Sequence, residues 1–181
     1  MAPGPYVEPS PPTVLADRLG AALPGTVLSV TVFRNEVTVE VPKDRILEIA
    51  RFLRDDPECA CDMLVDVTGL HHLEGEHEHE VIYQLYSLEK GHRLRLVARL
   101  RPKETVASVT PVWKGANWME REVFDLVGIR FAGHPDLRRI IMPEDYADHP
   151  LRKDFDVEGG PASIDVDGRP ASPGFRDMDH I

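Results

Sequence analysis

The feature that most constrains the fold is a strict alternation in RLRLVARLR, residues 93–101. Leu94, Leu96, Ala98 and Leu100 occupy every second position, and arginines fill most positions between them. Successive side chains of a strand point to opposite faces, so this pattern predicts a strand with an apolar face and a basic face. The chain therefore needs a sheet that is covered on one side and solvated on the other.

Further segments predict strands of the same sheet. Residues 27–41, VLSVTVFRNEVTVEV, indicate a hairpin that turns near Asn35, with valines alternating against polar residues in its second strand. Residues 62–73 and 80–89 are rich in β-branched and aromatic residues. The short links EGEHE and KGH join these two segments and the alternating strand, which predicts an antiparallel meander.

Two helices are predicted between these strands. The first begins near Thr13 and is stopped by Pro24 and Gly25. Its apolar stripe is Leu15, Leu19, Ala22 and Leu23. The second is expected to be capped by Asp44 and to end before Pro57. Its inner stripe is Ile46, Ile49, Ala50 and Leu53.

This element order predicts an α+β fold of two layers, in which two helices pack on a mixed, mostly antiparallel sheet of about five strands. A further helix and an extended C-terminal arm follow the sheet. We predict a flexible, proline-rich N-terminal lead at 1–12, an α+β domain at 13–131 that includes a helix at 118–127, an extended docking segment at 132–155 and an acidic C-terminal tail at 156–181.

Composition excludes several classes of protein. The chain of 181 residues has a formal charge of −10, which argues against a nucleic-acid binder. No apolar run approaches the ~20 residues of a membrane helix, and no signal peptide is recognisable, so we expect a cytosolic protein without direct membrane insertion. Cys59 and Cys61 are too few and too close for a complete zinc or iron–sulfur site, which favours two reduced thiols.

A histidine-rich stretch, HHLEGEHEHE, leaves two interpretations open. His71, His72, His77 and His79 lie close in sequence, and facing strands of a hairpin could bring two or three of them together as a metal site. The alternative, which we favour, is a polar hairpin tip. No helical H-E-x-x-H spacing is present to support catalysis by these residues.

The segment NWMEREVFDLVGIRF predicts an amphipathic helix with a dense set of charges. Asn117 is placed to cap the helix with Glu120 at the third helical position, and Glu120 and Glu122 favour the positive end of the helix dipole. Arg121 and Asp125 are four residues apart and are expected to pair. These roles explain the charges structurally. A hydrolase using both glutamates is disfavoured, because residues two apart on a helix do not face each other.

The end of this helix and the segment after it are also marked by the sequence. Gly128 suits the left-handed position that ends a helix. Beyond it, proline recurs at Pro135, Pro143 and Pro150, which favours extended backbone. Bases and acids nearly balance there, and apolar residues are scattered without periodicity. Such a strip is typical of an arm that docks on another surface.

Over roughly residues 13–155, the sequence resembles that of the 30-kDa subunit, also called the C subunit, of proton-pumping NADH–quinone oxidoreductase (respiratory complex I). The resemblance rests on ERE, D, GI, GHPDLRR, PED and HPLRKDF, read in order from Glu120. It implies the family fold, in which two helices pack on a mixed sheet. The residues to which it assigns partner docking and fold-holding are Glu120, Arg121, Glu122, Asp125, Gly128, His134, Pro135, Asp136, Arg138, Arg139, Pro143, Glu144, Asp145, His149, Pro150, Arg152, Lys153 and Asp154.

The resemblance implies an accessory protein at the cytoplasmic face of the cell membrane that has no cofactor, metal or catalytic residue of its own. It would support electron transfer from NADH to quinone, coupled to proton translocation, with FMN, iron–sulfur clusters and quinone bound by other parts of the complex. Docking on the neighbouring D subunit would pair Arg138, Arg139, Arg152 and Lys153 with carboxylates of that partner. Two alternatives stay open: the equivalent subunit of a membrane-bound hydrogenase or ferredoxin-fed complex, and a stand-alone metal-binding protein using the histidine-rich hairpin.

Overall fold

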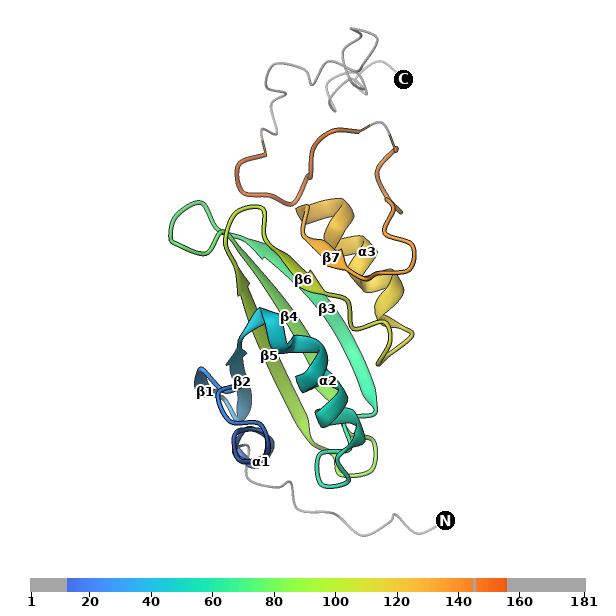
Figure 1. The fold of residues 1–181 in the computed structure, drawn as a ribbon. Coiled ribbons are helices and arrows are strands. Elements are labelled where there is room, and N and C mark those ends of the chain that lie inside the picture. Colours follow the sequence, from blue (N-terminus) through green and yellow to red (C-terminus); the bar gives the residue numbers. More distant parts are fainter. Residues whose placement is uncertain (1–12, 145, 156–181) are drawn as a thin grey trace, which may run out of the picture.

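The computed structural model describes residues 13–144 and 146–155, so the predicted lead, the acidic tail and Asp145 lie outside the described residues. Figure 1 shows helices packed against a twisted sheet, with a long irregular arm that follows the last helix. The elements, in chain order, are α1 (Val14–Ala22), β1 (Ser29–Phe33), β2 (Glu36–Val41), a 3-10 turn η1 (Lys43–Arg45), α2 (Ile46–Asp55), β3 (Met63–His71), β4 (His79–Tyr86), β5 (Arg93–Leu100), β6 (Thr105–Ala107), α3 (Ala116–Val127) and β7 (Arg130–Ala132).

The main sheet has the order β1-β2-β5-β4-β3. The β1–β2 hairpin and the β3–β4–β5 meander are antiparallel, and β2 pairs with β5 in parallel, so the sheet is mixed as expected. The parallel pair exists because α2 and the meander carry the chain across the sheet before β5 returns beside β2. A second sheet, which the sequence did not predict, consists of the short parallel strands β6 and β7.

The helices and the sheet share one continuous core. The predicted inner residues of β5 are buried, and so is the inner stripe of α2. Strand register places Tyr83 opposite Leu96, and Val81 opposite Ala98, so β4 contributes to the same core. Burial of this apolar layer supplies the main driving force for the fold. The predicted two-layer α+β architecture is confirmed.

The opposite face of the sheet is lined by cross-strand ion pairs. Arg99 lies 3.0 Å from Glu80 and 3.7 Å from Glu40, and Arg95 lies 2.9 Å from Glu36. These are outward arginines of the alternating segment, and each meets acids of a neighbouring strand. Exposed pairs of this kind add little stability, but they favour this register of the strands.

Two local predictions in the helical layer are wrong. Asp44 does not cap α2, because its carboxylate accepts a hydrogen bond from the Lys43 ammonium at 2.7 Å and the chain forms η1 instead. Arg45 then precedes α2 and pairs with Glu48. In α1 the buried residues are Leu15, Ala16 and Leu19, whereas Ala22 is exposed, so the buried face of the helix includes Ala16 and not Ala22.

Helix α3 packs closely on strand β3 at Gly69. A Cβ atom added there would lie 2.6 Å from Cγ1 of Val123 and 3.2 Å from Cδ1 of Ile129. Only glycine leaves room for the helix at this distance from the sheet. The approach at Gly69 therefore fixes how α3, and the arm that follows it, sit on the domain.

Replacing Gly69 with alanine should lower the free energy of unfolding by about 1–3 kcal/mol, because the new methyl group overlaps Val123. Gly115→Ala is the matched control: its Cβ meets nothing within 4 Å, and its φ of −62° suits alanine. Denaturant unfolding of the full chain measures both. If the clash is the cause, the double variant Gly69→Ala and Val123→Ala will lose less free energy of unfolding than the two single variants lose together.

Candidate functional site

The charged helix begins before its predicted start, and its charges have other partners than expected. Helix α3 starts at Ala116 with Gly115 before it, and no side chain caps it, so the predicted Asn117 cap is wrong. Burial decides this outcome. Glu120 faces the interior and is fully buried, so its carboxylate cannot turn back to the start of the helix.

Glu120 ties α3 to the loop that follows β6. Its Oε2 accepts a hydrogen bond from Ser108 Oγ at 2.6 Å, and its Oε1 accepts one from the N–H of Val109 at 2.7 Å. Burial raises the pKa of Glu120 to about 7, although these two hydrogen bonds oppose the rise. The nearby imidazole of His134 lies 3.9 Å from Oε2, and both side chains are shielded from solvent.

Arg121 does not pair with Asp125, so this prediction is also wrong. Its guanidinium donates to the carbonyl of Arg138 at 3.1 Å and to that of Arg139 at 3.3 Å, and it lies 4.8 Å from the ring centre of Trp118. The irregular arm has carbonyl groups that need donors, and a guanidinium supplies several in one plane. Arg121 therefore holds the middle of the arm against α3.

Asp125 is the main anchor of the arm. Its Oδ2 accepts hydrogen bonds from three consecutive N–H groups, those of Ile140, Ile141 and Met142, at 2.7–3.0 Å. Its Oδ1 accepts one from Arg139 at 2.7 Å. Burial alone would raise the pKa of Asp125, but these donors outweigh burial and lower it below its usual value. The carboxylate is therefore ionised, and both of its oxygens are bound.

The two His-Pro motifs bind the two ends of α3. His134 Nε2 lies 3.1 Å from the carbonyl of Asn117, and its Nδ1 accepts the N–H of Asp136, so Nε2 carries the hydrogen and donates. His149 Nδ1 donates to the carbonyl of Asp125 at 2.8 Å. Each imidazole thus supplies a hydrogen bond between the arm and the helix.

Gly128 ends α3 as predicted, in a left-handed conformation with φ of 88°. A Cβ atom there would lie only 2.7 Å from the ring of His149. Glycine is required at this position for two reasons: the backbone is left-handed, and the imidazole of His149 leaves no room for a Cβ atom. The ring of His149 also meets Phe124 edge-on, at 6.2 Å between centroids.

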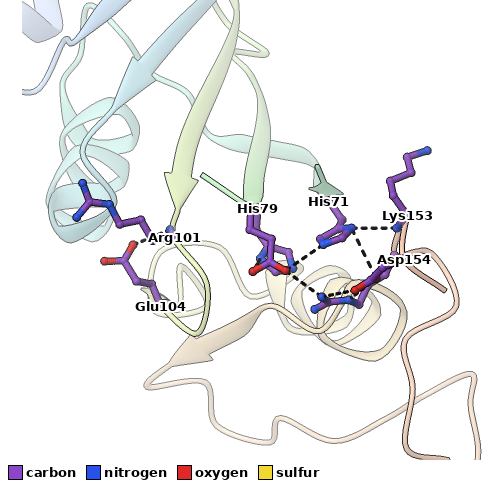
Figure 2. A network of polar contacts seen from close by, with 8 residues as sticks. His71, His79, Arg101, Glu104, Lys153 and Asp154 are labelled. Carbon is purple, nitrogen blue, oxygen red and sulfur yellow. Dashed lines mark hydrogen bonds and ion pairs between the residues drawn. The ribbon is translucent and has the colours of Figure 1, made fainter. Parts of the chain in front are cut away.

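The arm ends on the base of the β3–β4 hairpin (Figure 2). Arg152 lies 3.0 Å from Glu78 and 2.9 Å from Asp154. The N–H of Lys153 donates to Nδ1 of His71 at 2.9 Å. The interpretation of this hairpin as a polar tip is therefore wrong at its base, where His71 and its neighbour His79 are buried.

The structure brings most of the predicted docking residues together around α3 but gives many of them intramolecular partners. Arg139 pairs with Asp125, and Arg152 with Glu78, within this chain. Among the described residues, the side chain of Arg138 pairs with Asp136 of its own loop, and it is 64% exposed. The other predicted docking residues that lie at the surface are Glu122, Pro135, Asp136, Pro143, Glu144, Lys153 and Asp154, with Pro150 half-buried.

Large apolar side chains are also exposed along α3 and the arm. Trp118, Ile141 and Leu151 are 64%, 59% and 59% exposed. Trp118 stacks with the buried Arg121, which in turn binds the backbone of Arg138, so Trp118 and Arg138 lie close to the same guanidinium. We call the exposed residues Trp118, Arg138, Ile141, Leu151 and Lys153 the arm face. An aromatic and aliphatic surface with exposed cations is typical of a protein-binding site.

Candidate metal ligands lie close together at the cysteine pair and at the base of the β3–β4 hairpin. Cys59 and Cys61 are buried free thiols, and burial raises the pKa of each to about 12, so they are protonated and poor ligands. His71, Glu78 and His79 each offer one ligand atom, and these atoms lie within 4.8 Å of one another. Of the two groups, the second has the geometry of a metal site.

Comparison with known proteins identifies the family. Residues 39–161 match the family described as "Respiratory-chain NADH dehydrogenase, 30 Kd subunit". The chain belongs to this family. It is 45% identical over 145 residues to the C subunit of the NADH-quinone oxidoreductase of Azorhizobium caulinodans, covering 80% of this chain and 69% of that one. It is 49% identical over 144 residues to that of Roseiflexus castenholzii, covering 79% and 82%.

The fold of this family extends to more distant proteins. A chain from the structure of the membrane-bound sulfane sulfur reductase, an archaeal respiratory membrane complex, superposes with a TM-score of 0.65 at 23% identity. The match covers 78% of this chain and 84% of that chain, and at this identity it shows a shared fold. Among the described residues, no helix is long and apolar enough to cross a bilayer.

Sequence reasoning missed the residues that hold α3 and the arm in place. Ser108 binds Glu120, and Glu78 binds Arg152, 74 positions away in the chain. Nothing in local spacing signals such pairs. The burial of His71 and His79 did have a signal: both lie on the apolar side of the alternating pattern of their strands, opposite each other in register.

Replacing Asp125 with asparagine should lower the free energy of unfolding by about 3 kcal/mol, because an amide cannot accept from Arg139 and from three N–H groups at once. Asp136→Asn is the control, since its exposed pair with Arg138 should be worth less than about 1 kcal/mol. Amide exchange should accelerate at Ile140, Ile141 and Met142 only in the first variant. Equal protection in both variants would contradict the anchoring role.

The titration of Glu120 should make stability depend on pH. Its carboxyl keeps a proton up to a pH of about 7 in the folded chain, against 4.5 for the ordinary group. The unfolded chain therefore binds fewer protons in this window, so stability falls as pH rises from 4.5 to 7, by about 3 kcal/mol. Denaturant unfolding at several pH values measures this slope. Glu120→Gln should flatten it, whereas Glu122→Gln, at an exposed position, should leave it unchanged.

Proposed function

We propose that this chain is an accessory, cofactor-free subunit of the peripheral arm of NADH–quinone oxidoreductase, at the cytoplasmic face of the cell membrane. Its task is to hold neighbouring subunits together while electrons pass from NADH through iron–sulfur clusters to quinone, coupled to proton translocation. NADH, FMN, the clusters and quinone bind to other parts of the complex. The observation that carries this proposal is the family match over residues 39–161, which includes all of the arm that is described.

The geometry around α3 supports a binding role for this region. The charged groups that could do acid–base chemistry are used as anchors: Glu120 binds Ser108 and Val109, and Asp125 binds the arm. The hydrogen bonds of Asp125 rigidify the arm before a partner binds. A preformed surface loses less conformational entropy on binding than a flexible one.

The arm face is the proposed docking surface for the D subunit. Trp118 and Ile141 supply exposed apolar area, and Arg138 and Lys153 supply cations for carboxylates of the partner. The resemblance assigns Arg139 and Arg152 to docking as well. Their intramolecular ion pairs instead suit them to holding the arm in shape.

A second candidate is the equivalent subunit of a related complex with another electron donor, such as a membrane-bound hydrogenase or a ferredoxin-fed complex. This candidate is supported by the fold shared with a chain of the archaeal sulfane sulfur reductase, because the fold alone does not specify the electron donor. The flavin and nucleotide content of the purified complex distinguishes the two candidates.

Purification of the native complex through a tag on this chain, followed by mass spectrometry, tests the proposal. The other members of a quinone-reducing complex, the D subunit among them, should co-purify in equal amounts. Recovery of the chain alone from cells that contain an active complex would contradict the proposed function.

The arm face is tested by the double variant Arg138→Glu and Ile141→Asp, which introduces repulsion and a buried charge at the interface. We expect recovery of the D subunit and quinone reductase activity to fall together, by at least about tenfold. Arg51→Glu, at an exposed position on α2, is the matched charge control and should change neither. Full assembly and activity of the double variant would rule out the arm face while leaving membership of the complex intact.

A further inference from the structure

The base of the β3–β4 hairpin brings three metal-ligating side chains together (Figure 2). His71 ends β3 and His79 begins β4 as its register partner, so both rings emerge on one face, with centroids 5.0 Å apart. Glu78 reaches both: its Oε1 lies 3.2 Å from Nε2 of His71, and its Oε2 lies 4.0 Å from Nδ1 of His79.

One of these ligands is incompletely satisfied. His79 is only 7% exposed, and its Nε2 is buried without a hydrogen-bond partner. A buried polar atom without a partner costs free energy, and an ion bound through Nε2 would remove this cost, whereas Nδ1 is the nitrogen that lies 4.0 Å from Glu78.

We propose that His71, Glu78 and His79 bind a divalent transition-metal ion of the zinc class, and that this ion competes with the C-terminal arm for the same ligands. Two neutral imidazoles and one carboxylate are a common ligand set for zinc, with water at the fourth position. Zinc–ligand bonds of about 2.0–2.2 Å require ligand atoms roughly 3.3–3.6 Å apart. The ligand atoms now lie within 4.8 Å of one another, so they must move closer together to bind the ion.

The arm competes first for Glu78. The guanidinium of Arg152 lies 3.0 Å from Oε1, the same oxygen that faces His71. Arg152 therefore supplies the positive charge next to this carboxylate when the arm is bound. A metal ion in the site would be repelled by the guanidinium and must displace it.

The arm competes again at His71. Because Nδ1 accepts the N–H of Lys153, the neutral ring carries its hydrogen on Nε2, which faces Glu78. A metal ion can bind Nε2 only if this hydrogen leaves it and the neutral ring is protonated on Nδ1 instead. Two N–H donors would then face each other at His71 and Lys153. The metal-bound state and the arm-bound state therefore exclude each other, and metal binding releases the arm from the hairpin.

Zinc titration of the full chain, followed by competition with a chromophoric chelator, tests the site. We expect one ion per chain, with binding at least about tenfold weaker in His79→Ala. Arg152→Gln should bind at least about tenfold more tightly, because the competing cation is gone. Two controls should leave the affinity unchanged: Arg101→Gln, which removes a cation paired with Glu76 of the same hairpin, and His77→Ala, which removes a histidine outside the three ligands.

Amide exchange supplies the second measurement. Zinc, but not magnesium, should accelerate exchange at Lys153, since its hydrogen bond to His71 is lost. The proposal is overturned if zinc binds no more tightly to the wild-type chain than to His79→Ala. It is also overturned if Arg152→Gln has unchanged affinity and exchange at Lys153 does not respond. If His79→Ala does not fold, the zinc affinity of Arg152→Gln decides whether the proposal holds.

Discussion

The carboxylate of Asp125 is the interaction on which the arrangement around α3 depends. The arm is irregular, so no helix or sheet ladder satisfies its backbone groups, and an unpaired N–H near the protein interior is costly. Asp125 accepts three consecutive N–H groups with one oxygen and a guanidinium with the other. A single buried side chain thereby replaces a strand partner and gives the segment a defined course.

The rest of the region is organised around this anchor. Glu120 fixes α3 to the loop after β6, Gly69 lets α3 approach the sheet, and Gly128 turns the chain so that the ring of His149 can lie against it. Each of these features places Asp125 where the arm can reach it. The buried charges of the helix therefore act inside the molecule, and the surface offered to a partner consists of the apolar and basic residues of the arm face.

The sequence predicted the sheet, the helical layer and the existence of an arm, because alternation and helical periodicity are local signals. Val37, Leu94 and Ile49 follow those signals, and each is buried where expected. The same reasoning failed for the Asn117 cap and for the pairing of Arg121 with Asp125, since local capping and pairing compete with partners from distant segments. Glu120 binds Ser108, twelve positions earlier, and Arg139 reaches Asp125 from beyond the helix. Tertiary burial decided these cases, and spacing along one helix carries no information about it.

The return of the arm to the β3–β4 hairpin has a consequence for the order of folding. Lys153 and His71 are 82 positions apart, so their hydrogen bond closes almost half of the chain into one loop. During synthesis the hairpin leaves the ribosome long before its partner exists, and closing so long a loop costs entropy that a preformed docking site must offset. The arm is thus the last described segment to settle on the domain.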